Sequence, residues 1–340
     1  MLHKNMATVS ILSLLLTAGC DAGPGSSTVE STSHNLTIWE LLNMKQFSFD
    51  LVGRGLNGTH LNGDDLAQHM LVSVSLSGVV MPKGAPKDLT LSATLFKGAQ
   101  AKGKKPGHRD AVGAVFAGNL DDGTTLKLRI DDSSFTQGSS STFYRFAVSY
   151  QAKEGWLPLC GTDEAGMPVL AMPLNGTWEY REGIEGGGEW SDSDTLFTFA
   201  CEGYVLAKCV EMGYEPWAEG KLCDPAGNGS DCEKATLQAR HQACARALRA
   251  DYCGDGTSYT VDGMLINLYD GVGIRTDSEE WQLEAEWDED GAVCLAAQRV
   301  PSLPTPACLV GLASPDCGQP DHFEQGTLIM TEIPGTDDSI

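Results

Sequence analysis

Residues 241–256 read HQACARALRADYCGDG, and this stretch carries the strongest local signal in the chain. Its Ala, Leu, Gln and Arg residues favour a helix, and the turn Gly254-Asp255-Gly256 ends it. The inward stripe of that helix has the spacing i, i+4, i+7 and i+11, and it consists of Leu237, His241, Cys244 and Leu248. The stretch therefore predicts one arm of a buried amphipathic helix, with Cys253 at its end.

A capping box, Ser230-Asp231-Cys232-Glu233, predicts where this helix begins. Its arginines fall off the inward stripe; they are Arg240, Arg246 and Arg249. Residues 202–212 have the composition of an earlier helix, with Gly213 as its C-cap. Val205, Cys209 and Met212 share one face of that helix. The two segments together predict a helical hairpin.

The cysteine spacing suggests how the hairpin is cross-linked. Cys201 and Cys209 are eight residues apart, and Cys244 and Cys253 are nine apart. At about 1.5 Å per residue these spans have similar lengths, so an antiparallel pair would allow two bonds. We therefore predict Cys201–Cys253 and Cys209–Cys244, and the swapped pairings stay open.

The remaining cysteines extend this framework. Of 11 cysteines, all but Cys20 lie between Cys160 and Cys317, and an even number in an exported chain indicates disulfides. Cys223 and Cys232 flank a short Gly-rich loop and are predicted to pair. The last four are assigned as Cys308–Cys317 and Cys160–Cys294.

The first residues predict export and a lipid anchor. An apolar run at 9–16 is too short to span a membrane, and Thr17-Ala18-Gly19-Cys20 follows it. This is the pattern of a lipoprotein signal peptide over residues 1–19, in which Cys20 is acylated. Ordinary secretion with Cys20 as an incidental cysteine is the alternative. Residues 20–35 are rich in Gly, Ser and Thr and predict a flexible tether.

The rest of the chain predicts an α+β protein with two domains. Residues 36–155 contain short alternating strands separated by turn signals such as Asp122-Gly123, which indicates an antiparallel sandwich or small barrel. Residues 156–318 predict a disulfide-rich α+β domain, with the helical hairpin packed on antiparallel strands. Residues 319–340 are polar and acidic and predict a frayed tail.

Charge narrows the range of partners. The chain carries 46 acidic and 23 basic residues, for a net charge of −23, which argues against nucleic acid. A basic run at 97–109 predicts a solvated loop, with contact to an acidic partner or polysaccharide as the alternative. Asp251, Asp255 and Asp262 lack the spacing of an EF-hand loop, so we assign no metal, and no motif implies a cofactor.

Several segments together resemble the ADYC-domain family, which comprises cysteine-rich myxobacterial lipoproteins. They are residues 201–217 (CEGYVLAKCVEMGYEPW), residues 241–256 with Ala250-Asp251-Tyr252-Cys253, and the pairs Asp262-Gly263 and Tyr269-Asp270. The resemblance covers about residues 156–317. It implies an envelope lipoprotein of unknown function and transfers no catalytic residue.

The sequence thus favours a non-enzymatic envelope protein that binds a partner or has a structural role at the surface. The predicted partners are the membrane, through the lipid on Cys20, and an envelope protein or polysaccharide. The predicted location is the outer membrane or cell surface rather than the inner membrane. Trp217, Trp281 and Trp287 are candidate contact residues if they are exposed, although the sequence favours a buried core position for each.

The alternative is an extracytoplasmic hydrolase that uses His241 and nearby acidic residues. His241 shares the inward stripe of its helix, so the sequence favours a core histidine over a catalytic one. His322 lies near the predicted tail. Asp251 and Asp255 flank the turn after the helix, where carboxylates commonly cap backbone amides. We therefore assign no catalytic residue.

Overall fold

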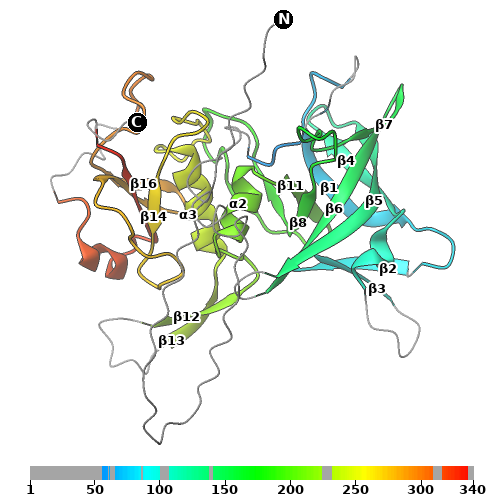
Figure 1. Ribbon diagram of the computed structural model, residues 1–340, viewed down its shortest axis with the longest axis horizontal. Helices are drawn as coiled ribbons and strands as arrows, with labels where there is room; N and C mark the ends of the chain where they lie inside the picture. Colours follow the sequence, from blue (N-terminus) through cyan, green and yellow to red (C-terminus); the bar gives the residue numbers. More distant parts are fainter. Residues whose placement is uncertain are drawn as a thin grey trace, which may run out of the picture. The chain divides into compact units, whose positions relative to one another are not determined.

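Six antiparallel strands close into a barrel (Figure 1). In barrel order they are β5 (Thr125–Gln137), β4 (Val115–Leu120), β1 (Leu71–Val80), β11 (Leu196–Cys201), β8 (Ala171–Asn175) and β6 (Thr142–Ala152). Pairing between β5 and β6 closes the ring, and β7 (Gly155–Pro158) pairs with β6 outside it. Of the predicted alternatives, sandwich or small barrel, the barrel is therefore correct.

The computed structural model describes residues 56–59, 61, 66–85, 87–99, 107–137, 141–223, 232–308 and 316–335. All of them belong to one unit of the chain, 42–340. The predicted signal peptide, Cys20 and the tether lie outside the described residues. None of the described helices is long and apolar enough to cross a membrane.

Aromatic side chains fill the barrel. The two-residue period of β5 buries Leu128 and Ile130 completely. A hairpin formed by β2 (Lys87–Ser92) and β3 (Leu95–Ala99) contributes Phe96. The Phe96 ring is fully buried and lies 5.2 to 5.3 Å from the nearest rings, those of Phe116, Phe146 and Phe197. Such pairs add to the stability gained from burying apolar surface.

Two helices and a four-stranded antiparallel sheet form the second part of the fold. The helices are α2 (Val205–Glu211) and α3 (Gln238–Arg249). The sheet has the order β14 (Asn267–Tyr269), β17 (Ile329–Ile333), β15 (Gln282–Asp288) and β16 (Gly291–Leu295). α3 contacts both α2 and the strands β15, β16 and β17. The predicted helical pair on antiparallel strands is confirmed.

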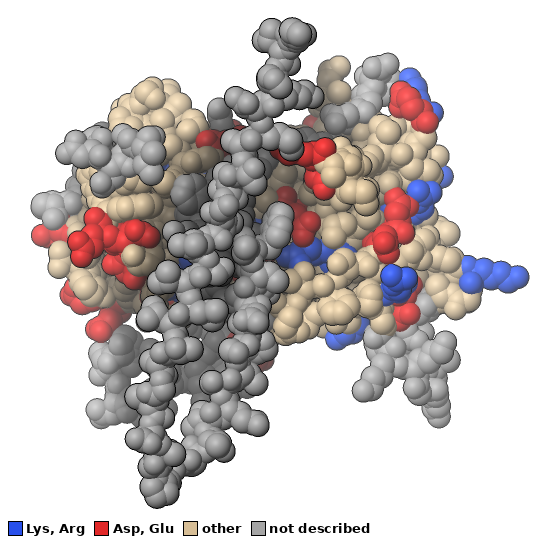
Figure 2. Space-filling model, in the orientation of Figure 1, with Lys and Arg blue, Asp and Glu red and all other residues tan. Residues whose placement is uncertain are grey.

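Shorter elements complete the described chain. Two-stranded ribbons are β9 (Thr177–Trp178) with β10 (Trp190–Ser191), and β12 (Glu219–Cys223) with β13 (Cys232–Thr236). Two 3-10 turns span His108–Ala111 and Pro320–Glu324. On the face shown in Figure 2, Lys and Arg side chains lie interspersed with Asp and Glu over the barrel, whereas Asp and Glu predominate around β14–β17.

The predicted boundary at residue 155 falls inside the barrel. β8 and β11 lie beyond this residue, yet each is hydrogen-bonded between other barrel strands. The predicted acidic tail also contains an ordered strand, because β17 pairs with both β14 and β15. Both differences arise from long-range strand pairing, which the local pattern does not specify.

The predicted ends of the second helix were wrong. Residues 232–236 form β13 instead of a first helical turn, and α3 begins at Gln238 after Leu237. The helix ends before Gly254, because Ala250 adopts a left-handed conformation with φ 51°. This conformation is unfavourable for alanine by about 1–2 kcal/mol, so other contacts must stabilise it.

Four disulfides cross-link the described residues: Cys160–Cys201, Cys209–Cys244, Cys253–Cys308 and Cys294–Cys317. The predicted Cys209–Cys244 bond is present. The predicted bonds Cys201–Cys253, Cys308–Cys317 and Cys160–Cys294 are not. Cys201 ends a barrel strand rather than starting a helix, so it meets Cys160, with the two Cα atoms 5.6 Å apart.

Cys223 and Cys232 lie directly opposite each other in the β12–β13 register. The structure describes their backbone only, so the Cys223–Cys232 bond stays a prediction.

Candidate functional site

The four residues Ala250-Asp251-Tyr252-Cys253 surround the C-terminal end of α3. The chain leaves the helix at Ala250, and the Asp251 N–H donates to the Arg246 carbonyl oxygen at 2.9 Å. Ala250, Asp251 and Tyr252 are each no more than 1% exposed. The helix end is therefore part of the core, where every polar group needs a partner.

Asp251 forms a buried ion pair. Its Oδ2 lies 2.5 Å from Nη1 of Arg246 and accepts the N–H of Gly256 at 3.0 Å. The same Arg246 nitrogen donates to the carbonyl oxygen of Gly187. Burial raises the pKa of Asp251, and the nearby Arg246 charge opposes that rise. This arrangement joins α3 to the loop before β10.

Tyr252 connects the helix end to the C-terminal sheet. Its hydroxyl donates to Glu284 Oε1 at 2.8 Å, and its oxygen accepts the backbone N–H of Arg299 at 2.8 Å. The Tyr252 ring stacks on Trp287, with centroids 5.4 Å apart. Burial raises the pKa of Tyr252 far above its ordinary value, so the group stays protonated.

Arg299 completes the same network. Its Nε and Nη2 bind the two oxygens of Glu284 at 2.9 and 2.7 Å, and neither side chain is exposed. Arg299 also donates to the carbonyl oxygens of Ala247 and Leu248 in the last turn of α3, where carbonyl groups lack partners within the helix. A buried arginine thus caps the helix.

Cys253 adds a covalent link to Cys308. Each residue of the motif therefore has a structural role. Ala250 forms the left-handed turn, Asp251 the ion pair, Tyr252 the hydrogen-bond network and Cys253 the disulfide. The motif holds the helix end in place rather than presenting free reactive groups.

His241 is completely buried in α3. Its Nε2 lies 3.0 Å from the Leu206 carbonyl oxygen, and its ring packs 5.7 Å from that of Trp178. Burial lowers the pKa of His241 to about 4, so the imidazole is neutral near pH 7. A hydrolase that uses His241 does not fit this geometry, because a substrate cannot touch the ring.

The other residues considered from the sequence have local roles. His322 lies 2.8 Å from Glu286, whose hydrogen bond raises the pKa of the histidine. Asp255 accepts the N–H of Thr257 at 2.9 Å, as expected for turn capping. Trp287 is completely buried, and Trp217 and Trp281 are half-buried.

Two groups of donor atoms in the described residues are close enough to hold a metal ion. One consists of Glu286, Cys294 and Cys317, but its sulfur atoms are joined in a disulfide. The other consists of His69, Asp121 and Asp122 on the surface of the barrel, with Asp121 Oδ1 3.0 Å from His69 Nδ1. We assign no ion to either group.

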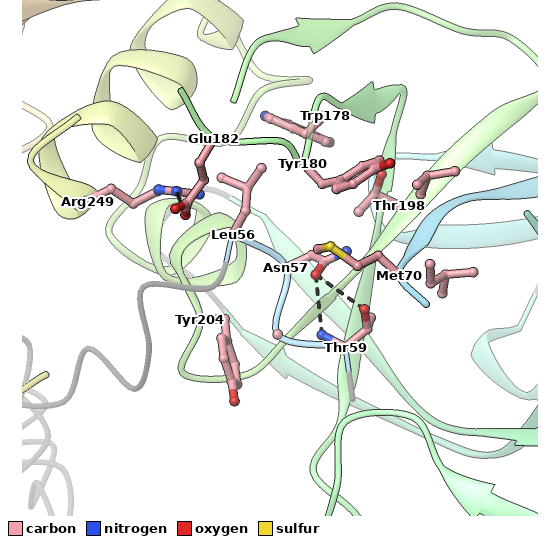
Figure 3. A pocket seen from close by; sticks show the side chains of 13 residues that line it. Leu56, Asn57, Thr59, Met70, Trp178, Tyr180, Glu182, Thr198, Tyr204 and Arg249 are labelled. Atoms are coloured by element: carbon pink, nitrogen blue, oxygen red, sulfur yellow. Dashed lines mark hydrogen bonds and ion pairs between the residues drawn. The ribbon is translucent and has the colours of Figure 1, made fainter. Parts of the chain in front are cut away.

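A cleft of about 160 Å³ lies beside the helix end (Figure 3). Its walls come from residues 56–59, β1, β9, β11, Glu182, Tyr204 and the last residue of α3, Arg249. Aromatic rings line it at Trp178, Tyr180 and Tyr204. A second hollow of about 390 Å³ shares Val72, Trp178 and Tyr180 with the first. Clefts of this kind, apolar with a few polar groups, are typical of binding sites.

The motif positions this cleft, because Arg249 immediately precedes Ala250. The Arg249 carbonyl oxygen accepts the Tyr259 N–H at 3.1 Å and the Ser258 hydroxyl at 3.0 Å. The sequence did not indicate Arg249 or its partner Glu182 as site residues. The position of Arg249 did indicate an internal contact. An arginine at the end of a buried helix, off its inward stripe, needs a partner inside the protein.

The fold and the site together define a disulfide-linked β-barrel protein with a buried polar network around one helix end. Residues 108–301 match the ADYC domain, more than half of the chain, so the protein belongs to the ADYC domain family. No curated protein and no solved structure matches the chain. The framework of disulfides is consistent with a secreted, extracytoplasmic protein.

Proposed function

We propose that this protein is a bacterial cell-envelope lipoprotein, anchored through an acylated Cys20, that binds an envelope protein or polysaccharide without catalysing a reaction. The outer membrane or cell surface is its proposed location. Asp21 beside Cys20 favours the alternative, which is retention in the inner membrane, and membrane fractionation decides between the two locations.

The observation that carries the anchoring proposal is the pairing of the cysteines. Eight are bonded to one another, and Cys223 and Cys232 lie opposite each other in one ribbon. With Cys223 and Cys232 paired as predicted, Cys20 is the one cysteine left over, and the small residues Ala18 and Gly19 precede it. A leftover cysteine directly after an apolar leader is best explained by acylation.

The binding role rests on how the polar groups are used. Asp251, Tyr252 and His241 face the core and contact other parts of the fold. The cleft beside Arg249, in contrast, offers aromatic walls and polar side chains at the surface. A rigid disulfide-linked frame with such a cleft suits recognition at the cell envelope.

Labelling with palmitate in the producing bacterium tests the anchor. The wild-type protein is expected to take up label and to fractionate with membranes. The Cys20→Ala variant is expected to lose the label and remain unprocessed. Equal labelling of both would refute acylation at Cys20. Cys20→Ala leaves the disulfide-bonded domain unchanged, so it separates anchoring from folding.

A further inference from the structure

Arg249 lines the cleft, and its guanidinium group has a buried edge that is only partly hydrogen-bonded. Its side chain is 4% exposed, and its Nη2 donates to Glu182 Oε1 at 2.7 Å and to the Gly256 carbonyl oxygen. Its Nε makes no hydrogen bond to any residue that the structure describes. Nε and Nη2 lie on the same edge of the guanidinium group, the edge that binds a carboxylate through two parallel hydrogen bonds.

In two other arginines of this chain, both Nε and Nη2 donate to a carboxylate. Arg181 binds both oxygens of Glu179 through Nε and Nη2, at 2.8 and 2.7 Å. Arg299 binds Glu284 in the same way. Arg249 differs from both, because one carboxylate oxygen reaches only one of its two nitrogens.

The two members of the Arg249–Glu182 pair differ in burial. The Glu182 side chain is 53% exposed, whereas Arg249 is almost completely buried. Burial lowers the pKa of Arg249 through desolvation, but an arginine remains charged at pH 7. The buried cation therefore needs anionic partners. The Asp251 charge favours it from nearby, and Glu182, which forms the hydrogen bond, is the half-exposed partner that a second carboxylate could replace.

We infer that the cleft binds the carboxylate of a uronic acid residue in an acidic polysaccharide, with that carboxylate replacing Glu182 on the Nε–Nη2 edge of Arg249. This inference rests on the proposed binding function and specifies its ligand. Glu182 acts as an internal competitor that turns outward into water when the ligand enters.

The other lining groups fit a sugar ring. Figure 3 shows Arg249 and Glu182 meeting at one end of the cleft, with Tyr180 near Thr198 further along it. Sugar rings stack on aromatic rings through their C–H faces, and the half-buried Tyr180 provides such a surface. The amide nitrogen of Asn57 can donate to a sugar hydroxyl, whereas Thr198 is buried and its own hydroxyl donates to the Gly176 carbonyl oxygen. The cleft volume of about 160 Å³ far exceeds the roughly 10–15 Å³ needed for one water.

The test is to titrate the purified full-length protein separately with D-glucuronate, D-glucose and acetate. Binding is measured by calorimetry or by ligand-observed NMR. D-glucuronate is expected to bind about tenfold more tightly than either of the others, because it alone offers both a carboxylate and a ring. Glu182→Gln is expected to strengthen glucuronate binding by about threefold or more, since it removes the competing charge.

Further variants separate the two parts of the site. Tyr180→Ala is expected to weaken glucuronate binding by about fivefold or more through the loss of stacking. Arg249→Lys keeps the charge but lacks the planar fork, so it is expected to abolish the preference for glucuronate over glucose. Glu185→Gln, an exposed residue of the same loop, is the matched control and is expected to bind as the wild type does.

Three outcomes would overturn the inference: glucose binding as tightly as glucuronate, acetate binding as tightly as glucuronate, or no gain in affinity in Glu182→Gln. Because Glu182→Gln is a surface change that is expected to increase affinity, misfolding cannot imitate its effect. Failure of these titrations would leave palmitate labelling at Cys20 unaffected, so the two proposals can fail separately.

Discussion

The hydroxyl of Tyr252 donates a 2.8 Å hydrogen bond to Glu284, across 32 positions of the sequence. This contact joins the end of α3 to the middle of β15, and neither group is more than 1% exposed. Since Glu284 also holds Arg299, which caps α3, the two residues couple the helix to the sheet. The third residue of the family's motif is thus a structural link.

Removing this hydroxyl is expected to destabilise the protein. Tyr252→Phe leaves the buried Arg299 N–H without its acceptor and removes one of the two hydrogen bonds to Glu284 Oε1, which costs about 1–3 kcal/mol. Urea unfolding followed by tryptophan fluorescence measures the effect. Tyr259→Phe, in a half-buried ring next to Tyr252, is the matched control. Equal unfolding midpoints for the two variants would contradict the role given to the Tyr252 hydroxyl.

Breaking the buried ion pair of Asp251 is expected to have a larger effect. Asp251→Asn leaves the Arg246 charge without its 2.5 Å partner, and such a loss costs about 3–5 kcal/mol. Asp255→Asn, in the same turn, retains an oxygen that can accept the Thr257 N–H. The measurement is the free energy of unfolding for both variants. A loss in Asp251→Asn no larger than in Asp255→Asn would count against the ion pair as a stabilising contact.

His241 is expected to make stability depend on pH. Its pKa is lowered to about 4 in the folded protein, against an ordinary value of 6.5, because burial disfavours the charged ring. The unfolded chain therefore binds a proton that the folded chain does not, and stability falls as pH drops from 6.5 towards 4. The loss amounts to about 3 kcal/mol at roughly 1.4 kcal/mol per pH unit.

His241→Gln tests this dependence, because glutamine can still donate to the Leu206 carbonyl oxygen but does not titrate. As pH falls from 7 to 4, the free energy of unfolding of the wild type is expected to decrease more than that of the variant. A difference that stays constant between pH 7 and 4 would show that the pKa of His241 is the same in the folded and the unfolded protein.

Peptide mapping under non-reducing conditions checks the disulfide framework. The expected linked peptides join Cys160 to Cys201, Cys253 to Cys308 and Cys294 to Cys317, besides Cys209 to Cys244. Cys223 is expected to be linked to Cys232, its neighbour across β12–β13. A peptide that links Cys201 to Cys253 would instead support the spacing argument and contradict the barrel position of Cys201.

Local patterns predicted much of the fold. The two-residue alternation in strands such as β5 implied one buried and one exposed face, which a barrel satisfies. The helical spacing of Leu237, His241 and Cys244 implied burial, and all three side chains are buried. The bond between Cys209 and Cys244 followed because both cysteines lie on the facing sides of packed helices. In each case the sequence pattern behind the prediction lies within one strand or helix, or within two that pack directly against each other.

The candidate site could not be predicted in this way. Glu182 and Arg249 are 67 positions apart, and nothing in either local segment indicates that they meet. Their contact depends on α3 lying against the loop before β10, which in turn depends on the Asp251–Arg246 pair and the Gly187 carbonyl oxygen. Arg246 and Arg249 are buried although they lie off the apolar stripe of α3, so each needs an acidic partner inside the protein. Only the assembled fold shows which residues those partners are.

The amino-acid sequence alone therefore determined the periodicity of strands and helices, the acidic composition and the family motif, because these depend on composition and neighbouring residues. Tertiary structure decided which strands close the barrel, that Cys201 meets Cys160, and that the chain after residue 319 supplies β17. It also decided what the motif does, since the roles of Asp251, Tyr252 and Cys253 depend on partners that only long-range packing brings within bonding distance.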